Sequence, residues 1–589
     1  MLVQGHFVKW KIDVGCVALI LLALAALLFV HQVFALKLVV DDSYISFRYS
    51  RNLSLGEGLC YNPGERVEGY TNFLWVLLLG LFHRAGADIV KASDVLGSLA
   101  FLLMIPVLCR ALPKAHPSAA LARFIAPVVF IFSLPALFWA RSGMETLFFS
   151  FFMILGVVLS SEEEPERPGT LILAGLSLGG AALLRPEGVL AFGVLFLFRT
   201  GYVLVKKKNP LPALIRFVSG FLGIFLPHFL WRLSYYGFPF PNTFYAKVSG
   251  IEDLGIEGVK YLTSFCMVGG GFLFYAAALF LVFRAPSFRI LSWNALLWVY
   301  TAYIVSVGGD TMVLHRFFVP ILPLMTLFLG EVLWRQGFSR EGKPVARAAA
   351  FMVFLLFTSL VFWISLRAHL RTIHYYQNAN LGRRAVGEWL RENAAPGTSI
   401  GEVQAGIIPY VSGLYTLDIL GLNDRHIAHT KPTITSHGRI GLAHFKHDAS
   451  YVLSRKPDYL LFGLRKLMGE SAPEIAPPFR EVFLNWKGEK GDFTRIPAVY
   501  ELFTSPGFQR NYAPVYLKLP ARDYYVATFR RTGGGGPGES EIQERIGLVE
   551  EESGFPAGAL EAYRKALEAD PGNRSAAEGI ARLQAVLKK

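Results

Sequence analysis

The run VGCVALILLALAALLFVHQVFALKLVVDD (14–42) decides the class of fold, because an apolar segment long enough to cross a bilayer ends directly in two adjacent carboxylates. Further long apolar runs occur around 92–110, 119–139, 145–160, 170–184, 188–205, 211–233, 260–283, 288–307, 317–334 and 346–367. Since a spanning helix needs about 20 mostly apolar residues, these runs predict a polytopic, mainly α-helical membrane protein with about eleven transmembrane helices. The first run is longer than the apolar part of a usual signal peptide, so we interpret it as an uncleaved anchor.

The composition supports this class. Of 589 residues, 53% are hydrophobic and 17% are charged, and the mean hydropathy is +0.41. A soluble domain carries about 25% charged residues, so an ordinary soluble protein is excluded, and so is a disordered one. A net charge of +14 would suggest nucleic acid in a soluble protein. Here the basic residues stand between apolar runs, which indicates membrane orientation and no nucleic-acid partner.

Loop charge predicts the orientation. We interpret Phe73–Phe82 as an interfacial or re-entrant helix, because it is too short to span. The loops rich in Lys and Arg then share one side, which the positive-inside rule makes cytoplasmic: 110–114, 206–208, 284–289 and 335–347. We therefore expect a multi-pass protein of the inner (cytoplasmic) membrane, with a cytoplasmic N-terminus and an external, periplasmic C-terminal domain.

The character of the chain changes after residue 368. Residues 1–368 form the predicted transmembrane core, with its first outer loop at 38–91. Short β-rich runs predict an external α/β domain over 369–530, with strands near 398–402, 415–420 and 459–462. A Gly-rich linker (531–538) leads to a helical tail (539–589), in which 557–573 resembles one tetratricopeptide unit. Because about three such units are needed to bury a core, we expect this helical pair to dock on something, a protein partner being one candidate.

Polar residues collect in the loops that this orientation places outside: 39–52, 60–72, 140–146, 184–188, 235–248 and 308–317. Ionisable residues at membrane depth are usually functional, so we predict one site at the outer interface. Asp41 and Asp42 are the candidate catalytic residues, because a partly buried Asp beside a second carboxylate has a raised pKa and suits proton abstraction. The alternative is that Asp42 or Ser43 caps a helix that begins at Tyr44.

Other residue types on that side suggest ligand binding. Five cations could hold a phosphate, the alternative being contact with lipid headgroups: Lys247, Arg316, Arg185, His315 and Arg141. Candidates for binding a sugar or an acceptor are Tyr44, Glu68, Glu145, Glu187, Asn242, Tyr245 and Asp310. Five histidines occur without cysteine between 426 and 447, and we predict no metal site there: His426, His429, His437, His444 and His447. Gly269–Gly271 lies within an apolar run and is expected to permit close helix packing.

The segment DDSYISFRYSRNLSLGEGLCYNPGERVEGYTNFLW (41–75) resembles the first outer loop of the membrane-embedded GT-C glycosyltransferases. The most similar subgroup comprises the mycobacterial terminal arabinofuranosyltransferase and its bacterial relatives, some of which are assigned to flagellar motor control. Later segments resemble the same subgroup in the same order: SGMET (142–146), RPEG (185–188), PNTFYAK (241–247), GGDTMVLHRFFVP (308–320) and LDILGLND (417–424).

The resemblance implies inverting transfer of a sugar, with a pentose such as arabinofuranose favoured, from a polyprenyl-phosphate donor. The acceptor would be a hydroxyl of an envelope glycan or glycolipid at the outer face, and Asp41, in preference to Asp42, would be the base. An outward site has no access to cytosolic nucleotide sugars, which also favours a lipid-linked donor. No cofactor is required, although the paired aspartates could hold a divalent metal. The α/β domain would cover the site or bind the acceptor, with 401–413 as a ligand-facing edge and 418–424 reaching the cleft.

Three alternatives remain open at this stage. A related GT-C enzyme could use a hexose or aminosugar donor on protein or lipid, since one sequence does not define pocket shape. A transporter is disfavoured by charges confined to one side and by the lack of an internal repeat. A non-enzymatic membrane scaffold that uses the helical tail is the third.

Overall fold

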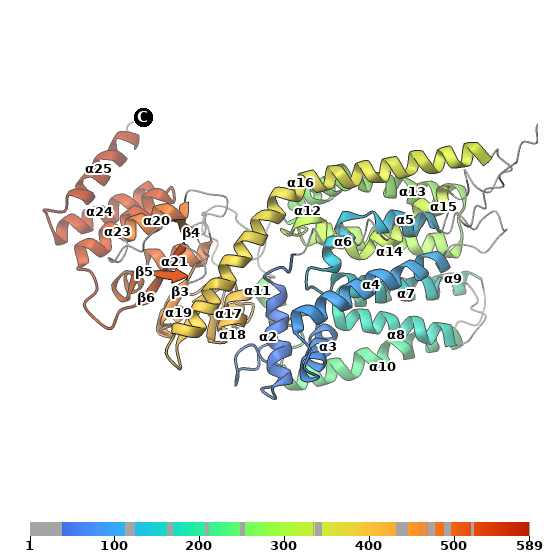
Figure 1. The fold of residues 1–589 in the computed structure, drawn as a ribbon, viewed down its shortest axis with the longest axis horizontal. Coiled ribbons are helices and arrows are strands. Elements are labelled where there is room, and N and C mark those ends of the chain that lie inside the picture. The colour runs from blue at the N-terminus through green and yellow to red at the C-terminus, as the bar shows by residue number, and fades with distance from the viewer. Residues whose placement is uncertain are drawn as a thin grey trace, which may run out of the picture. The chain divides into compact units, whose positions relative to one another are not determined.

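The computed structural model describes residues 38–111, 124–161, 169–206, 211–247, 254–333, 335, 344–431, 446–462, 466–468, 478–487, 496–519 and 524–587. The chain divides into two compact units, each assembled from segments distant in the sequence (Figure 1). Unit 1 comprises Met1–Val39, Val90–Leu230 and Asp253–Ile373. Unit 2 comprises Val40–Ile89, Trp231–Glu252 and His374–Lys589. The predicted first span (14–37) lies outside the described residues.

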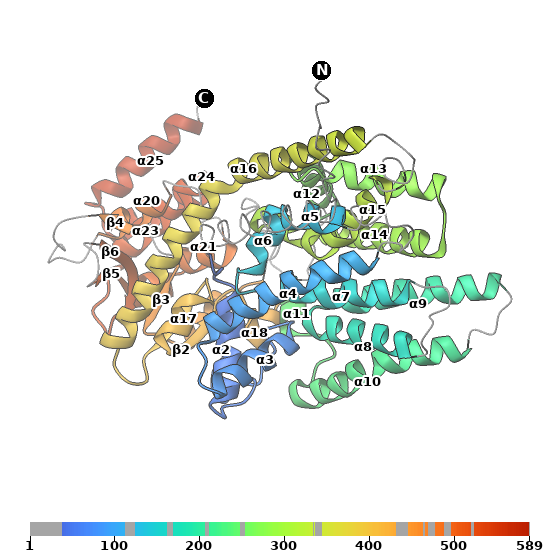
Figure 2. The ribbon, with the colours of Figure 1, turned by 45° about the vertical axis from the view of Figure 1, so that its right-hand side comes forward.

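Unit 1 is helical throughout its described part, and its helices lie on the apolar runs predicted beyond residue 90. They are α4 (Ile89–Ala111), α5 (Ile125–Ile131), α6 (Leu134–Ala140), α7 (Thr146–Ser160), α8 (Gly169–Leu184), α9 (Glu187–Val205), α10 (Leu211–Tyr236), α12 (Leu254–Val268), α13 (Gly271–Arg284), α14 (Phe288–Ser306), η3 (Val313–Ile321), α15 (Leu322–Leu333) and the first part of α16 (Pro344–Asn393). Helix α7 packs against α8, α8 against α9, and α9 against α14 (Figure 2).

Four helices of the described part are long and apolar enough to span a membrane: α4, α9, α10 and the continuous segment Val313–Leu333. Helices α7 and α8 are also apolar but have 15 and 16 residues. These helices confirm the predicted class, a multi-pass membrane protein that is mainly α-helical.

Two predicted spans are broken in the structure. The run 260–283 forms α12 and α13, which meet at 93°. Gly270 lies in the break with φ of 68°, a conformation that favours glycine, so the glycines expected to aid helix packing form a bend instead. The run 119–139 divides into α5 and α6, because Ser133 caps the second helix and Pro135 cannot continue the first.

The α/β part of unit 2 is built on a mixed six-stranded sheet: β1 (Ser399–Glu402), β2 (Tyr415–Asp418), β3 (Tyr459–Leu461), β4 (Lys466–Met468), β5 (Tyr512–Leu519) and β6 (Tyr524–Arg531). The order is β2-β1-β3-β6-β4, with β5 also on β6. Strand β1 is parallel to β2 and β3, whereas β6 is antiparallel to its neighbours. The first three strands lie where the sequence predicted them.

Two hydrophobic clusters hold this sheet. One includes Val386 and Leu390 of α16 with Ile400 of β1. The other is rich in phenylalanine and includes Phe479 and Phe503 from α20 (Phe479–Lys487) and α21 (Pro497–Thr504). Short helices α19 (Ala449–Ser454) and α22 (Pro506–Asn511) complete this region.

The predicted first outer loop and the loop after α10 belong to unit 2. They form α2 (Ser43–Ser54), α3 (Phe73–Arg84) and α11 (Asn242–Lys247). Helix α2 packs against α3 and against α17 (Ile407–Ser412), and α11 packs against α18 (Arg425–His429). Ser46 and Asn72 hydrogen-bond to each other at 3.0–3.1 Å and join α2 to the start of α3. The α/β domain and these loops therefore belong to one compact unit.

The tail has three helices, α23 (Glu539–Glu552), α24 (Pro556–Ala569) and α25 (Arg574–Leu587), rather than the predicted pair. Tyr563 of α24 is buried against Gly547 and Gly579 of the flanking helices, where a larger residue would clash. Helix α23 packs on α20, α21 and α22, and its Leu548 and Val549 join the phenylalanine-rich cluster. The tail therefore docks on the α/β domain of its own chain.

Candidate functional site

Asp41 is held in one orientation by the segment that follows β1. Its Oδ1 accepts a hydrogen bond from the Ile407 N–H at 3.0 Å, and Arg383 Nε lies 3.9 Å away. Gly406 packs so closely that a Cβ there would meet Asp41 backbone oxygen and carboxyl atoms at clashing distance. Burial raises the pKa of Asp41, and the Arg383 charge opposes that effect. A fixed carboxylate with a raised pKa suits general-base chemistry.

Asp42 has a different environment. It is exposed at the N-cap position of α2, and its side chain makes no capping hydrogen bond. The Ser43 hydroxyl does not cap the helix either, since it donates to the Val40 carbonyl at 2.6 Å. The alternative interpretation, in which one of these two residues caps the helix, is therefore wrong. Of the two aspartates, only Asp41 combines partial burial with a fixed geometry.

Tyr44 lies in the first turn of α2, in the same unit as Asp41. Its ring makes edge-to-face contacts with Phe47 and Tyr410, at 5.1 and 5.3 Å between centroids. Burial raises the pKa of Tyr44 to about 12, so its hydroxyl stays protonated at neutral pH. These contacts pack the Tyr44 ring among other aromatic rings. Its predicted role in binding a sugar stays a prediction.

A network that the sequence analysis missed anchors α2 to the α/β domain. Arg48 is 2% exposed and donates to the carbonyls of Tyr61, Pro409 and Leu414 at 2.6–2.7 Å. It also donates to Asn62 Oδ1 at 3.0 Å, and Asn62 in turn pairs with both backbone groups of Thr416. The only sequence signal was a helix with many polar residues, SYISFRYSRNLS (43–54), that the structure buries on nearly every side.

Glu402 was also missed. It ends β1, is fully buried, and accepts a hydrogen bond from the Gln404 N–H at 2.8 Å through Oε1. Within the described part of the chain, its Oε2 has no hydrogen-bond partner. Burial raises the pKa of Glu402 well above its usual value, and the Asp41 charge adds to this effect. A second carboxyl group with a raised pKa therefore stands near the candidate base.

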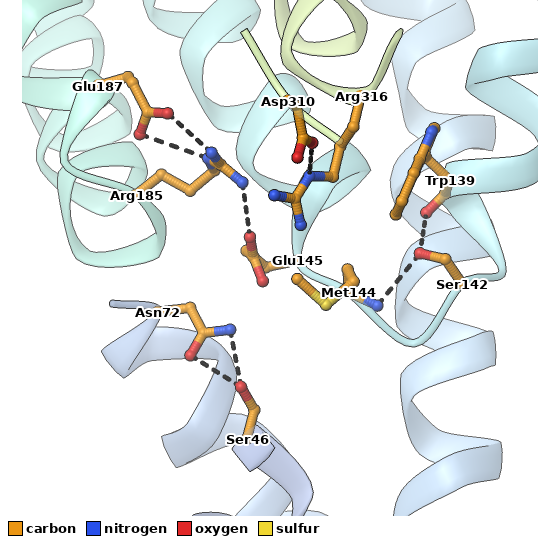
Figure 3. Close-up of polar contacts among 10 residues, drawn as sticks. All are labelled: Ser46, Asn72, Trp139, Ser142, Met144, Glu145, Arg185, Glu187, Asp310 and Arg316. Carbon is orange, nitrogen blue, oxygen red and sulfur yellow. Dashed lines mark hydrogen bonds and ion pairs between the residues drawn. The ribbon is translucent and has the colours of Figure 1, made fainter. Parts of the chain in front are cut away.

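In unit 1, predicted cations and acids come together as ion pairs (Figure 3). Arg185, at the end of α8, contacts Glu145 at 3.1 Å and Glu187 at 2.7 Å. Arg316 Nε donates to Asp310 at 2.6 Å. Both guanidinium groups lie against the ring of Phe317, at 5.5 and 5.3 Å from its centroid.

The predicted phosphate-binding arginines of this cluster are thus already paired with carboxylates of the protein. The Nε, Nη1 and Nη2 atoms of Arg185 all donate to carboxylates, whereas the Asp310 contact uses only Nε of Arg316. Arg316 is therefore the more available of the two for a phosphate. Glu145, Glu187 and Asp310 position these cations, and a direct role for the three acids at a sugar stays a prediction.

The SGMET segment forms a tight turn before α7. Ser142 Oγ donates to the Trp139 carbonyl at 3.1 Å and accepts from the Met144 N–H at 3.3 Å (Figure 3). This turn positions Glu145. The preceding Arg141 makes a two-pronged ion pair with Asp94 at 2.6 Å, so its charge is compensated locally.

His315 and its neighbour Leu314 have positive φ angles of 49° and 58°. Non-glycine residues in this conformation are uncommon and concentrate at functional sites. The ring of His315 is within hydrogen-bonding distance of Ser264, at 2.9 Å, and packs on Tyr261. Lys247 lies exposed at the end of α11 in unit 2.

Three predicted sugar or acceptor residues of unit 2 line one pocket: Glu68, Asn242 and Tyr245. Asn242 Nδ2 donates to the carbonyls of Gly421, Leu422 and Asp424 at 2.9–3.1 Å and so fixes the LDILGLND segment. Asp418 in that segment accepts from Leu420 and Asn423, and burial raises its pKa to about 6. The hydrogen bonds of Asp418 therefore stabilise the conformation of the segment, and those of Asn242 attach it to α11.

Of the three described histidines of the 426–447 region, two pair with acids, and His429 contacts the Arg425 carbonyl. His426 lies 2.8 Å from Asp448, and His447 lies 2.6 Å from Glu501. No group of three or more His, Cys, Asp or Glu that could hold a metal occurs in the described part of the chain. His437 and His444 lie outside it.

Comparison with known proteins bears out the predicted resemblance. The chain is 27% identical over 240 residues to the terminal beta-(1->2)-arabinofuranosyltransferase of Mycobacterium tuberculosis, covering 38% of this chain and 37% of that protein. It is 26% identical over 331 residues to the Corynebacterium glutamicum enzyme of the same name, covering 49% and 47%. The chain thus spans less than half the length of these relatives.

The fold also has known counterparts. The apo structure of ArnT from Cupriavidus metallidurans superposes with a TM-score of 0.50 and 15% identity, covering 69% of this chain and 86% of ArnT. Residues 369–529 match a family described as a domain of unknown function, DUF8728. Part of the chain is therefore similar in sequence to terminal arabinofuranosyltransferases, and its fold is similar to that of ArnT.

Proposed function

We propose that this protein is an inverting glycosyltransferase that moves a sugar from a polyprenyl-phosphate donor to a hydroxyl of an envelope glycan or glycolipid. The observation that carries the proposal is Asp41. It follows the predicted first span, occurs in the segment that resembles the GT-C first outer loop, and is partly buried with a raised pKa. The arabinofuranosyltransferase relatives favour a pentose such as arabinofuranose as the transferred sugar.

In the proposed reaction Asp41 accepts the proton of the acceptor hydroxyl. The acceptor oxygen then forms a bond to C1 of the donor sugar from the face opposite the phosphate. The bond between C1 and the phosphate oxygen breaks, and polyprenyl phosphate leaves with the electron pair. Because the leaving group gains negative charge, fixed cations lower the barrier, and Arg316, Lys247 and Arg185 are the candidates.

Transfer is proposed to occur at the outer face of the membrane. The Lys- and Arg-rich loops then lie in the cytoplasm, and residues after 368 lie outside the cell or in the periplasm. No nucleotide sugar reaches that side, which makes a lipid-linked sugar the available activated donor. The proposal needs no metal ion or other cofactor.

The test is sugar transfer in membranes that contain the protein, supplied with labelled polyprenyl-phosphate pentose, hexose or aminosugar. Wild type is compared with Asp41→Asn and Asp42→Asn at matched expression, and Arg455→Gln, an exposed residue of the α/β domain, serves as the control. We expect transfer from the pentose donor that is lost in Asp41→Asn and kept in the control. General-base assistance is typically worth about 10²–10⁴-fold, so the loss should be at least a hundredfold.

Each other outcome has a definite meaning. Transfer from the hexose or aminosugar donor alone would establish the related GT-C activity and refute the pentose. Activity that survives Asp41→Asn but not Asp42→Asn would move the base to Asp42. If no donor is consumed while the cellular role of the protein persists in both variants, the protein is a scaffold and the proposal fails.

A further inference from the structure

The side-chain contacts of Asp41 come from the α/β domain, more than 300 residues further along the chain. The Ile407 N–H donates to Oδ1 at 3.0 Å, Arg383 Nε lies 3.9 Å from the same oxygen, and Gly406 packs against the carboxyl group. All these partners fall within 369–529, the stretch that matches a family of unknown function, and they share unit 2 with Asp41. A domain without an assigned function therefore surrounds the candidate base.

Arg383 is held in place by neutral groups. It lies in the second half of α16 and is 7% exposed. Its Nε donates to Gln404 Oε1 and its Nη1 donates to Asn380 Oδ1, each at 2.7 Å. Two amide oxygens fix the guanidinium without cancelling its charge. Within the described residues, Asp41 is the one carboxylate that lies within 4 Å of an Arg383 nitrogen. The charge of Arg383 is therefore directed to Asp41.

Glu402 shows how a carboxyl group behaves nearby without this compensation. It is fully buried at the end of β1, and in the described part of the chain its Oε2 has no hydrogen-bond partner. Burial raises the pKa of Glu402 well above its usual value, which favours the protonated form. At Asp41, by contrast, the Arg383 charge is the largest of the effects that oppose burial. Of these two carboxyl groups, Asp41 is thus the one that carries the negative charge.

We infer that Arg383 is a positioning residue of the proposed reaction: fixed by Gln404 and Asn380, it supplies the positive charge that keeps Asp41 available as the base. The inference rests on the proposed function, and it gives the domain of 369–529 a part in catalysis. A base must be unprotonated before it can accept the proton of the acceptor hydroxyl. Arg383 acts on the reaction through Asp41, because a fixed cation beside a partly buried carboxyl group favours its charged form.

The role of Arg383 predicts a particular pH dependence. The titratable groups around Asp41 are Arg383 of α16, Glu402 of β1, Tyr410 of α17, Tyr61 of the first loop, and the adjacent Asp42 and Tyr44. Arginine stays charged, and burial raises the pKa of each tyrosine, so these groups keep their charge state below pH 9. The Arg383 charge lowers the pKa of Asp41, and its removal raises that pKa. Sugar transfer should then require a higher pH.

The first experiment measures sugar transfer in membranes between pH 5 and 9, with the donor that wild type consumes. In Arg383→Gln we expect the fall of activity on the acid side to move upward by about 1–3 pH units, with recovery toward pH 9. Arg383→Lys keeps the charge and should move it by less than about one pH unit. Arg384→Gln, at the exposed neighbouring position that pairs with Glu388, is the matched control and should leave the profile in place. A merely structural role would lower transfer by the same factor at every pH.

The second experiment needs no substrate. Thermal unfolding in detergent at pH 8 compares wild type with Arg383→Gln, Asp41→Asn and the double variant. We expect Arg383→Gln to lower the Tm by at least about 2 °C more when Asp41 is present than when it is replaced, because only then does it leave a carboxylate without its cation. If Arg383→Gln does not fold, Gln404→Leu takes its place in both experiments. It removes one of the two acceptors that hold the guanidinium, so its effects should have the same direction and be smaller.

A pH profile that does not move in Arg383→Gln, or that moves equally in Arg383→Lys, would overturn the inference. Additive changes in Tm would do the same, since they would show that the two side chains do not interact. A wild type that transfers no sugar refutes the proposed function and with it the part of Arg383 in catalysis. The unfolding experiment separates this failure from the other, because it detects the interaction between Arg383 and Asp41 whether or not sugar is transferred.

Discussion

Replacing Arg48 by Met tests whether the first outer loop and the α/β domain depend on each other. The wild-type guanidinium makes four hydrogen bonds, three of them to the carbonyls of Tyr61, Pro409 and Leu414. At about 1.5 kcal/mol for each bond to a charged group, their loss costs about 6 kcal/mol. The carbonyls retain other donors, such as the Gly413 N–H at Pro409, which prevents a larger penalty.

The removal of a buried charge recovers part of this cost. The pKa of Arg48 is lowered by burial, which shows that its charge is poorly solvated. Allowing about half of the gross cost for that recovery leaves a net loss near 3 kcal/mol in the free energy of unfolding. For a large domain this corresponds to a fall of about 6–12 °C in Tm. Arg48→Lys should restore little of the lost stability, since an ammonium group cannot make the four hydrogen bonds of the planar guanidinium.

The assay is thermal unfolding of the purified protein in detergent, together with limited proteolysis of 403–414. We expect the lower Tm to be accompanied by faster cleavage of this segment and by loss of sugar transfer, because the segment holds Asp41. Arg384→Met, an exposed position paired with Glu388 one turn away, is the control and should change stability by less than about 0.5 kcal/mol. A Tm for Arg48→Met that matches the control would refute the reasoning.

Three further predictions concern other parts of the chain. Arg185→Gln leaves two buried carboxylates without their cation, so we expect a loss of about 3–5 kcal/mol, measured as a lower Tm in detergent. Tyr563→Ala empties the space between the tail helices and should cost about 3–5 kcal/mol, while Lys565→Ala on the exposed face changes little; equal Tm values would contradict the observed packing of the three tail helices. Burial raises the pKa of Glu501, but the contacts with His447 and the Ala449 N–H lower it by more, so the pKa is lowered overall. Wild type should therefore have a larger free energy of unfolding than Glu501→Gln at neutral pH. This difference should disappear as the pH falls through the lowered pKa of Glu501, which unfolding measured as a function of pH would show.

The apolar runs allowed most of the fold to be predicted from the sequence. A bilayer forces every backbone group in a span to be paired within the helix, so hydropathy alone places the helices. The bend at Gly270 was not predicted, although three consecutive glycines in an apolar run were a visible signal. Strands β5 and β6 were also not predicted, even though 512–519 alternates in the way typical of a half-buried strand.

The candidate site was less accessible to sequence reasoning. Residue types indicated that Arg185 and Arg316 are functional cations, but their pairing with Glu145, Glu187 and Asp310 depends on how separate helices pack. Two adjacent aspartates look equivalent in a sequence, and only the fold distinguishes partly buried Asp41 from exposed Asp42. Arg48 and Glu402 drew no attention because their importance comes from contacts with distant parts of the chain.

The assembly of unit 2 from three separate segments has a consequence for biosynthesis. The bonds from Arg48 to Pro409 and from Tyr61 to Ala405 join residues 361 and 344 positions apart. At about 5–20 residues per second, a ribosome needs roughly 20–70 s to make the chain between such partners. During that time the polar side chains of α2 lack the partners that they have in the folded protein, because the segment around β1 and α17 has not yet been synthesised. Substitutions in the α/β domain should therefore appear in cells as degradation of chains whose N-terminal half is normal in sequence.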